Sequence, residues 1–375
     1  MNKPVHEKAV IIGISGPSSS GKTTLARLLQ RVFCGVNLPK DKRLNTFIIH
    51  EDDFYFPDDK CVYLYFSSIH PYKPSQVEAP SSQNPNTKPR LMPFPPPSNT
   101  NTPPRIPYTT TASGKTIQDW DTASAIDIPF LSQALQYVRE NGTLPPRLRS
   151  KEDQNDQTES GVSDEIVQEL RDVVSSRLRD EASGQDTENP TMAFLEGFLL
   201  FAPPEQEQHV LRSVHDAIHL PLFLPAAYEL VKSRREGRSG YVTVGPAPEP
   251  PVQASTDGSD SGDGKTTDID LDAEDDRPPQ NFWVDPPGYV DDIVWPRYVT
   301  DHAWLLIAED GGGHEKKKGG SQALAEADIV RRIGDGTRAR TDVGVEVAPG
   351  CGSAGMDVVL RWAVELILGH YLDRT

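Results

Sequence analysis

The chain has 375 residues, and only 36% of them are hydrophobic while 34 are Pro and 28 are Gly, so part of this length cannot join a packed core. The formal net charge is −17, but residues 151–190 carry twelve acidic against four basic side chains, and residues 255–276 carry nine against one. These two segments together account for −16, so the remainder is close to neutral and shows no basic surface for nucleic acid.

The three cysteines, Cys34, Cys61 and Cys351, are odd in number and lack the spacing of a metal site or a disulfide framework. The first residues contain no apolar signal-peptide region, and no apolar run approaches the length of a membrane span. We therefore expect a cytoplasmic protein without membrane or nucleic-acid partners, although a nuclear location stays open.

The first predicted element is a buried parallel strand over residues 9–14, followed by a glycine-rich turn and a helix. The turn fits the phosphate-loop pattern G-x-x-x-x-G-K-[ST], in which glycines let backbone N–H groups approach phosphate closely. Lys22 would reach the β- and γ-phosphates, and the Thr23 hydroxyl would bind Mg²⁺. The residues predicted to bind the nucleotide are Gly16, Pro17, Ser18, Ser19, Ser20, Gly21, Lys22, Thr23 and Thr24.

Further elements follow in alternation. A second strand is predicted at residues 46–50, and a helix at residues 126–138. The acidic stretch contains an amphipathic helix candidate that Ser163 can cap. The remaining predicted elements are strands at 193–201, 217–224 and 343–347, and helices at 226–236 and 356–372. Strands alternating with helices predict an α/β fold with a doubly wound parallel sheet, which with the loop is the P-loop NTPase fold.

We expect one P-loop kinase domain over residues 1–375 with long insertions that are disordered or loosely ordered. The segment from Pro71 to Pro107 alone contains twelve prolines, which is typical of a polyproline-like or disordered insertion. The predicted insertions are 71–115, 149–190, 245–280 and 308–340.

Two carboxylates stand where phosphoryl transfer could use them. Asp52 follows the second strand, and active sites of open α/β sheets lie outside the carboxyl ends of the strands. It could hold Mg²⁺ through water or accept the proton of the acceptor hydroxyl; the alternative is a turn or cap residue. Glu196 is a lone acid in an apolar strand, so it needs a partner, either a metal or substrate or a structural cation.

Aromatic and cationic side chains complete the candidate site. Trp120 could stack on a planar ring, and Asp121 could accept two hydrogen bonds from a vicinal diol, although a Trp is more often a core residue. The segment from Asp285 to Tyr298 is rich in aromatics and could wall a base pocket or pack the edge of the domain. A cationic lid over the phosphates is predicted from Arg234, Arg235 and Arg238, which adjoin glycines.

Taken in order, these motifs resemble the nicotinamide riboside kinase family, within the uridine-kinase-like branch of phosphate-loop kinases, in a long fungal-type form with insertions. The segments that carry the resemblance are residues 13–26, 51–55, 119–121, 195–201, 233–235, 286–289 and 294–296. They make up less than half of the chain. Long insertions interrupt the family pattern, and Trp120 stands where a tyrosine is common.

The resemblance implies Mg²⁺-dependent transfer of the ATP γ-phosphate to the ribose 5′-hydroxyl of nicotinamide riboside for NAD synthesis, with nicotinic acid riboside as a candidate second acceptor. Asp52 would match the catalytic carboxylate, which acts with Lys22. Asp121 would match the residue that binds the ribose diol. The remaining roles implied are Trp120 and Tyr289 for stacking on nicotinamide, Thr23 and Glu196 for the metal, and Arg234, Arg235 and Arg238 for ATP.

Two alternatives stay open. A uridine or cytidine kinase would keep the fold and change the acceptor, whereas pantothenate has neither the diol nor the ring that Trp120 and Asp121 suit. A nucleotide-regulated interaction protein would instead use the Pro-rich and acidic insertions, since proline segments can dock in aromatic grooves of partners. Which protein partners the insertions would bind is unknown from the sequence.

Overall fold

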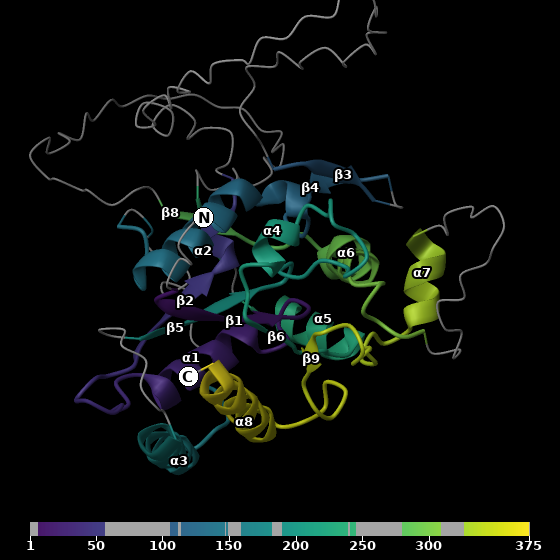
Figure 1. Ribbon diagram of the computed structural model, residues 1–375. Helices are drawn as coiled ribbons and strands as arrows, with labels where there is room; N and C mark the ends of the chain where they lie inside the picture. The colour runs from purple at the N-terminus through teal and green to yellow at the C-terminus, as the bar shows by residue number, and fades with distance from the viewer. Residues whose placement is uncertain are drawn as a thin grey trace, which may run out of the picture.

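A computed structural model describes the parts of the chain that form the domain. The described residues are 7–56, 106–111, 114–146, 148, 159–181, 190–238, 241–244, 280–308 and 326–374. Their central feature is a five-stranded sheet in the order β2-β5-β1-β6-β9, in which all neighbouring strands pair in parallel (Figure 1). The strands are β1 (Ala9–Ser15), β2 (Asn45–His50), β5 (Thr191–Gly197), β6 (Leu220–Phe223) and β9 (Glu346–Val347).

Helices cover both faces of this sheet (Figure 1). One face packs against α1 (Lys22–Phe33), α3 (Asp164–Glu181) and α8 (Met356–Arg374). The other packs against α2 (Ile128–Asn141), α4 (Arg212–His215) and α6 (Trp295–Asp301). The predicted α/β fold with a doubly wound parallel sheet is therefore confirmed.

The strand sequences explain why the sheet is covered twice. Side chains alternate between the faces of a strand, so a strand buried on both sides must be apolar at every position. In β1, Ile11 packs toward α2 while Ile12 and Ile14 pack toward α1 and α8. In β5, Phe194 and Leu195 divide between the two faces in the same way.

Two small antiparallel strand pairs and several short helical elements complete the described structure. The strands β3 (Tyr108–Thr110) and β4 (Thr116–Gln118) form one antiparallel pair, and β7 (Tyr241–Val244) and β8 (Gln280–Trp283) form another. The helix α5 (Tyr228–Glu236) follows β6. Two further elements are a π-helical turn over Val290–Val294 that runs into α6, and α7 (Glu326–Ile333).

Three of the predicted insertions contain ordered elements, of which the first along the chain is β3 within 71–115. The helix α3 lies within 149–190 and buries Val174 and Leu178 against α1 and α8, so its amphipathic stripe prevails over the acidic composition around it. Similarly, α7 lies within 308–340 and packs beside α6. Most of the remaining predicted insertion residues lie outside the described part of the chain. Among the described helices, none is both long and apolar enough to cross a membrane.

Candidate active site

The phosphate loop leaves the carboxyl end of β1 and enters α1. Gly16 has a φ of 153° and Gly21 a φ of 100°, a region that favours glycine. A Cβ added to Gly16 would lie 2.3 Å from the backbone oxygen of Leu224, so the loop also requires glycine for space. The predicted strand, loop and helix are therefore present in the geometry that a phosphate cradle needs.

Three hydroxyl groups in this loop and at the end of β1 are candidates for binding a ligand. The hydroxyls of Ser15, Ser19 and Ser20 are buried and have no hydrogen-bond partner among the described residues. Lys22 is 9% exposed, and its Nζ donates to the carbonyl oxygen of Pro17 at 2.9 Å. Because buried polar groups are almost always paired, these orphaned hydroxyls fit a site that phosphate oxygens fill. Burial lowers the pKa of Lys22, an effect that the negative charges of Glu196 and Asp52 oppose.

Glu196 lies at the carboxyl end of β5, facing the start of α1. Its Oε1 is 2.7 Å from Nδ1 of His50 at the end of β2, and it also hydrogen-bonds the Thr23 side chain. Burial alone would raise the pKa of Glu196, but the hydrogen bond and charge of His50 and the charge of Lys22 lower it. The structure thus brings together the two residues predicted for the metal, and adds His50, which the sequence analysis missed.

Thr23 and Glu196 supply oxygen ligands, the kind that Mg²⁺ prefers. In the described residues, no group of three or more His, Cys, Asp and Glu side chains is placed to hold a metal ion. This donor set fits Mg²⁺, which usually keeps several waters and binds through one or two protein groups together with substrate phosphates.

Three acidic residues follow β2, and the first two, Glu51 and Asp52, have opposite environments. Asp52 is exposed, and its charge reaches Lys22. Glu51 is 0% exposed, and its Oε2 accepts the backbone N–H groups of Phe198 and Leu199 at 2.7 and 3.1 Å. Burial raises the pKa of Glu51 to about 8. Glu51 therefore ties the turn that carries Asp52 to the end of β5, a role that the sequence analysis did not foresee.

Asp121 pairs with Arg235, a residue that was predicted to contact ATP. Arg235 donates from both terminal nitrogens to the two oxygens of Asp121, at 3.1 and 3.2 Å, and from Nε to Asp285 at 2.7 Å. Its side chain is only 8% exposed. Two carboxylates thus hold its guanidinium, and these contacts give no support to the predicted role of Arg235 in binding ATP, which stays a prediction.

The other two arginines of the predicted lid lie on the phosphate side. Arg234 donates to the backbone oxygen of Ser19 in the phosphate loop at 3.1 Å. The charge of Arg238 contributes to the lowered pKa of Lys22, which places it near the loop. Neighbouring arginines of one short helix thus face different halves of the site.

Aromatic rings surround Trp120. Its ring packs edge-on against Tyr55, with centroids 5.5 Å apart, and tilted against Trp283 at 5.6 Å. Tyr289 is 1% exposed, its ring faces Arg235, and its hydroxyl accepts the backbone N–H of Trp120 at 3.0 Å. The prediction that Tyr289 stacks on a ligand ring does not fit this burial. Trp283 is half-buried, so more of its ring is exposed for contact with a ligand. The sequence analysis did not single it out.

A second buried ion pair supports the loop before Trp120. Arg297 of α6 donates to Oδ2 of Asp119 at 2.7 and 2.9 Å, and Thr109 donates to the same oxygen. Asp119 is 0% exposed. The motif around Trp120 is therefore anchored from both α6 and the β3–β4 pair. No pattern in the sequence predicts these contacts, because Arg297 lies far along the chain from Asp119 and Thr109.

The fold and this site define an α/β protein of the phosphate-loop kinase class. Comparison with known proteins gives a more specific result. The chain is 24% identical over 306 residues to the nicotinamide riboside kinase of Schizosaccharomyces pombe, a match that covers 82% of this chain and 84% of the relative. It is 22% identical to the enzymes of the same name from Saccharomyces cerevisiae and Eremothecium gossypii, over 82% and 79% of this chain and 83% and 77% of the relatives.

No protein-family profile matches the chain. The three fungal relatives nevertheless cover most of its length, and they support the assignment to the nicotinamide riboside kinase family of phosphotransferases that the motifs predicted.

Proposed function

We propose that the protein transfers the γ-phosphate of ATP to the 5′-hydroxyl of nicotinamide riboside, which yields the mononucleotide for NAD synthesis. The observation that carries this proposal is the arrangement at the carboxyl edge of the sheet. A phosphate loop with unpartnered hydroxyls, the Asp121–Arg235 pair and the exposed Asp52, which follows the edge strand β2, supply the groups that such a transfer needs. The names of the fungal relatives support the same acceptor.

On the phosphate side, Lys22 and the loop would bind the triphosphate, with Arg234 and Arg238 contributing positive charge. Phosphoryl transfer depends mainly on positioning and on neutralising the charge of the transferring group. Thr23 and Glu196 would hold Mg²⁺, which supplies further charge neutralisation at the phosphates when it is bound. The hydrogen bond between His50 and Glu196 keeps this carboxylate oriented and ionised.

On the acceptor side, Asp52 would orient the 5′-hydroxyl and accept its proton. It is the most exposed of the three acids that follow β2, whereas Glu51 is buried and accepts hydrogen bonds from backbone N–H groups. Asp121 would bind the ribose diol, because a carboxylate has lone pairs beyond the two that Arg235 occupies. Trp120 and its aromatic neighbours would pack against the ring.

The test is a steady-state phosphorylation assay with Mg²⁺ and ATP that offers nicotinamide riboside, nicotinic acid riboside, uridine, cytidine and pantothenate in parallel. Asp52→Asn removes the proton acceptor without changing size, and Asp53→Asn is the matched control in the same turn. We expect turnover of nicotinamide riboside that falls at least about a hundredfold in the first variant and by less than about threefold in the second.

The same assay separates the alternatives. Preference for uridine or cytidine would retain the kinase and replace the acceptor. Absence of turnover on every acceptor would favour an interaction protein. Substitution of GTP for ATP in parallel reactions tests the nucleotide preference, and comparison of the two pyridine ribosides tests the acceptor preference.

A further inference from the structure

Asp285 connects two parts of the acceptor site. One of its oxygens accepts Nε of Arg235 at 2.7 Å, and the other accepts the indole N–H of Trp283 at 2.8 Å and a terminal nitrogen of Arg235 at 3.3 Å. Its side chain is 14% exposed. The Asp285 carboxylate thus binds both the guanidinium of Arg235, which pairs with Asp121, and the indole of Trp283, which packs against Trp120.

The residues of this network come from three separate segments. Asp121 follows β4, Arg235 lies in α5, and Trp283 ends β8 two residues before Asp285. Trp283 contacts Trp120 with ring centroids 5.6 Å apart. A carboxylate at position 285 therefore determines how α5 and the β8 segment meet beside Asp121.

The network also has an unbalanced charge. Among the described side chains that these ion pairs and the neighbouring Arg297–Asp119 pair connect, three carboxylates meet two guanidiniums. All three carboxylates are buried or nearly so, and electrostatic interactions there are screened much less than at the surface. Burial raises the pKa of Asp121, and the negative charges of Asp285 and Asp119 raise it further, while the charge and hydrogen bonds of Arg235 oppose this and lower it. The acceptor side of the site therefore carries one excess negative charge.

We propose that Asp285 is a specificity-determining residue, which makes the acceptor side favour a ligand with a net positive ring over a neutral one. This inference rests on the proposed function and deepens it. Nicotinamide riboside carries a pyridinium cation and no compensating charge, whereas nicotinic acid riboside adds a carboxylate and is neutral overall. The two compounds share the ring skeleton and the ribose, so the excess charge acts on the difference between them.

Without Asp285, Asp121 and Arg235 would form a neutral pair, and the electrostatic preference for the cation would disappear. A unit charge at a separation of several ångströms in a partly buried site changes relative affinity by about tenfold. Screening by solvent at the half-exposed Trp283 reduces this effect, and we expect a change of about fivefold.

The experiment compares kcat/KM for nicotinamide riboside and nicotinic acid riboside in the full chain and in Asp285→Asn and Asp285→Glu. The kcat/KM for nicotinamide riboside divided by that for nicotinic acid riboside is expected to fall about fivefold in Asp285→Asn. It is expected to stay within about twofold in Asp285→Glu, which keeps the charge but shifts the geometry. Asp216→Asn, the same charge change at the opposite end of the sheet, should leave the ratio unchanged.

An equal loss on both ribosides in Asp285→Asn would show a purely structural role and overturn the proposal. A second measurement does not depend on phosphoryl transfer or on the folding of a variant. Quenching of tryptophan fluorescence reports binding of the cation N-methylnicotinamide and of neutral nicotinamide to the unmodified chain. Tighter binding of the cation supports the proposal even if neither riboside is phosphorylated, in which case the proposed function alone fails. Equal binding of the two probes overturns the proposal.

Discussion

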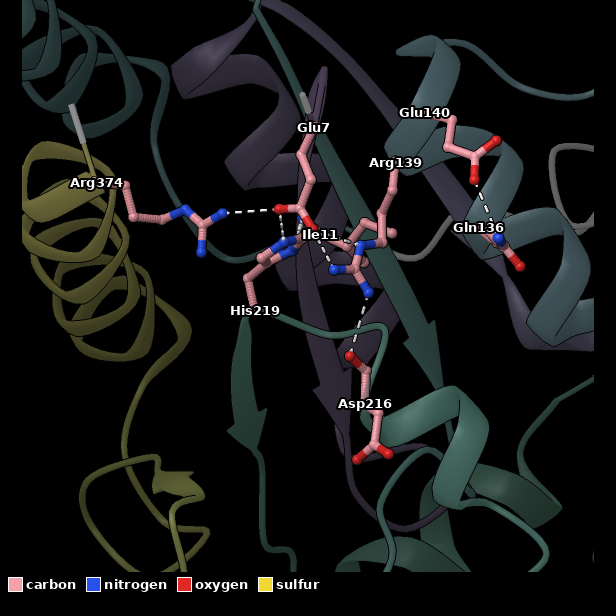
Figure 2. Close-up of polar contacts among 8 residues, drawn as sticks. All are labelled: Glu7, Ile11, Gln136, Arg139, Glu140, Asp216, His219 and Arg374. Carbon is pink, nitrogen blue, oxygen red and sulfur yellow. Dashed lines mark hydrogen bonds and ion pairs between the residues drawn. The ribbon is translucent and has the colours of Figure 1, made fainter. Parts of the chain in front are cut away.

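The two ends of the central sheet both carry clusters of polar and charged groups, but the hydrogen bonds of these groups are satisfied in different ways. At the amino ends of the strands, Glu7 accepts hydrogen bonds from Arg139, Arg374 and His219 (Figure 2). Nδ1 of His219 accepts the backbone N–H of Ile11 at 2.9 Å, so its proton is on Nε2, which donates to Glu7. Each of these side chains has its partner within the protein.

At the carboxyl ends of the strands, several buried polar groups have no hydrogen-bond partner in the part of the chain that the structure describes. The hydroxyls of Ser15, Ser19 and Ser20 and the Oε1 atom of Glu51 are buried without a hydrogen-bond partner among the described residues. Lys22 donates to a loop carbonyl although phosphate-loop lysines bind phosphates. An unmade hydrogen bond of a buried group costs about 1–3 kcal/mol, which a ligand with oxygen acceptors and donors can recover.

The comparison teaches how to distinguish a structural cluster from a binding site when both consist of polar and charged side chains. Glu7, Arg139 and Arg374 connect the segment before β1 to the ends of α2 and α8, and this network stabilises the domain. The unsatisfied groups at the other end lower stability until a ligand binds. Substitution of the unsatisfied polar groups should therefore affect activity, whereas substitution within the Glu7 network should affect stability.

The largest effect is expected for Lys22→Ala. Removal of the lysine should lower kcat about a thousandfold, because a charge that stabilises the transferring phosphoryl group is lost. The free energy of unfolding should stay unchanged or rise, since burial disfavours the charged lysine. Denaturant unfolding alongside the kinase assay checks both, and a destabilised variant would contradict the contrast between the two ends.

Gly197→Ala should destabilise the fold at the junction that supports Asp52. The new Cβ would lie 2.3 Å from Oε2 of Glu51, which is buried and held by two backbone N–H groups. We expect a loss of about 2 kcal/mol in the free energy of unfolding, as for overpacked cores. Gly369→Ala is the control, because Gly369 lies in α8 with no atom within 4 Å of an added Cβ and should gain about 0.5–1 kcal/mol. Equal effects of the two substitutions would show that Glu51 moves freely.

Glu7→Gln should have the smallest effect, a loss of about 1 kcal/mol of stability with kcat unchanged. Partial burial alone would raise the pKa of Glu7, but hydrogen bonds from Arg139 and His219 lower it from 4.5 to about 2. The folded form therefore holds the ionised carboxylate more strongly than the unfolded chain, and this stabilisation is present above about pH 4.5 and lost as the pH falls toward 2. Urea unfolding between pH 3 and 7 should show a stability difference between the chain and its variant that shrinks at low pH; a constant difference would refute the linkage.

The local geometry of the phosphate loop could be predicted from the sequence, because its residues form a contiguous motif between a strand and a helix. Backbone geometry at Gly16 and Gly21 follows directly from the glycine pattern. Glu196 was recognised since a lone acid in an apolar strand demands a partner, although the sequence could not show that His50 supplies it. The main strands and helices were predicted for the same local reason, with their ends shifted by a few residues.

The acceptor side was predicted less well. Arg235 pairs with residues 114 and 50 positions away, so the sequence places it beside Arg234 and cannot show that the two face apart. The family resemblance implied a stacking role for Tyr289, but the tertiary fold buries this residue beneath Arg235. Tertiary pairing, unlike local periodicity, leaves no pattern in a single sequence.

The contrast between the two ends is tested most directly by amide hydrogen exchange of the full chain, with and without a non-hydrolysable ATP analogue and Mg²⁺. The account predicts increased protection in peptides covering residues 15–25, 50–55 and 196–199, and no change around Glu7, Arg139 and His219. Protection that appears at the amino ends of the strands, or a phosphate loop that exchanges equally fast in both states, would contradict it.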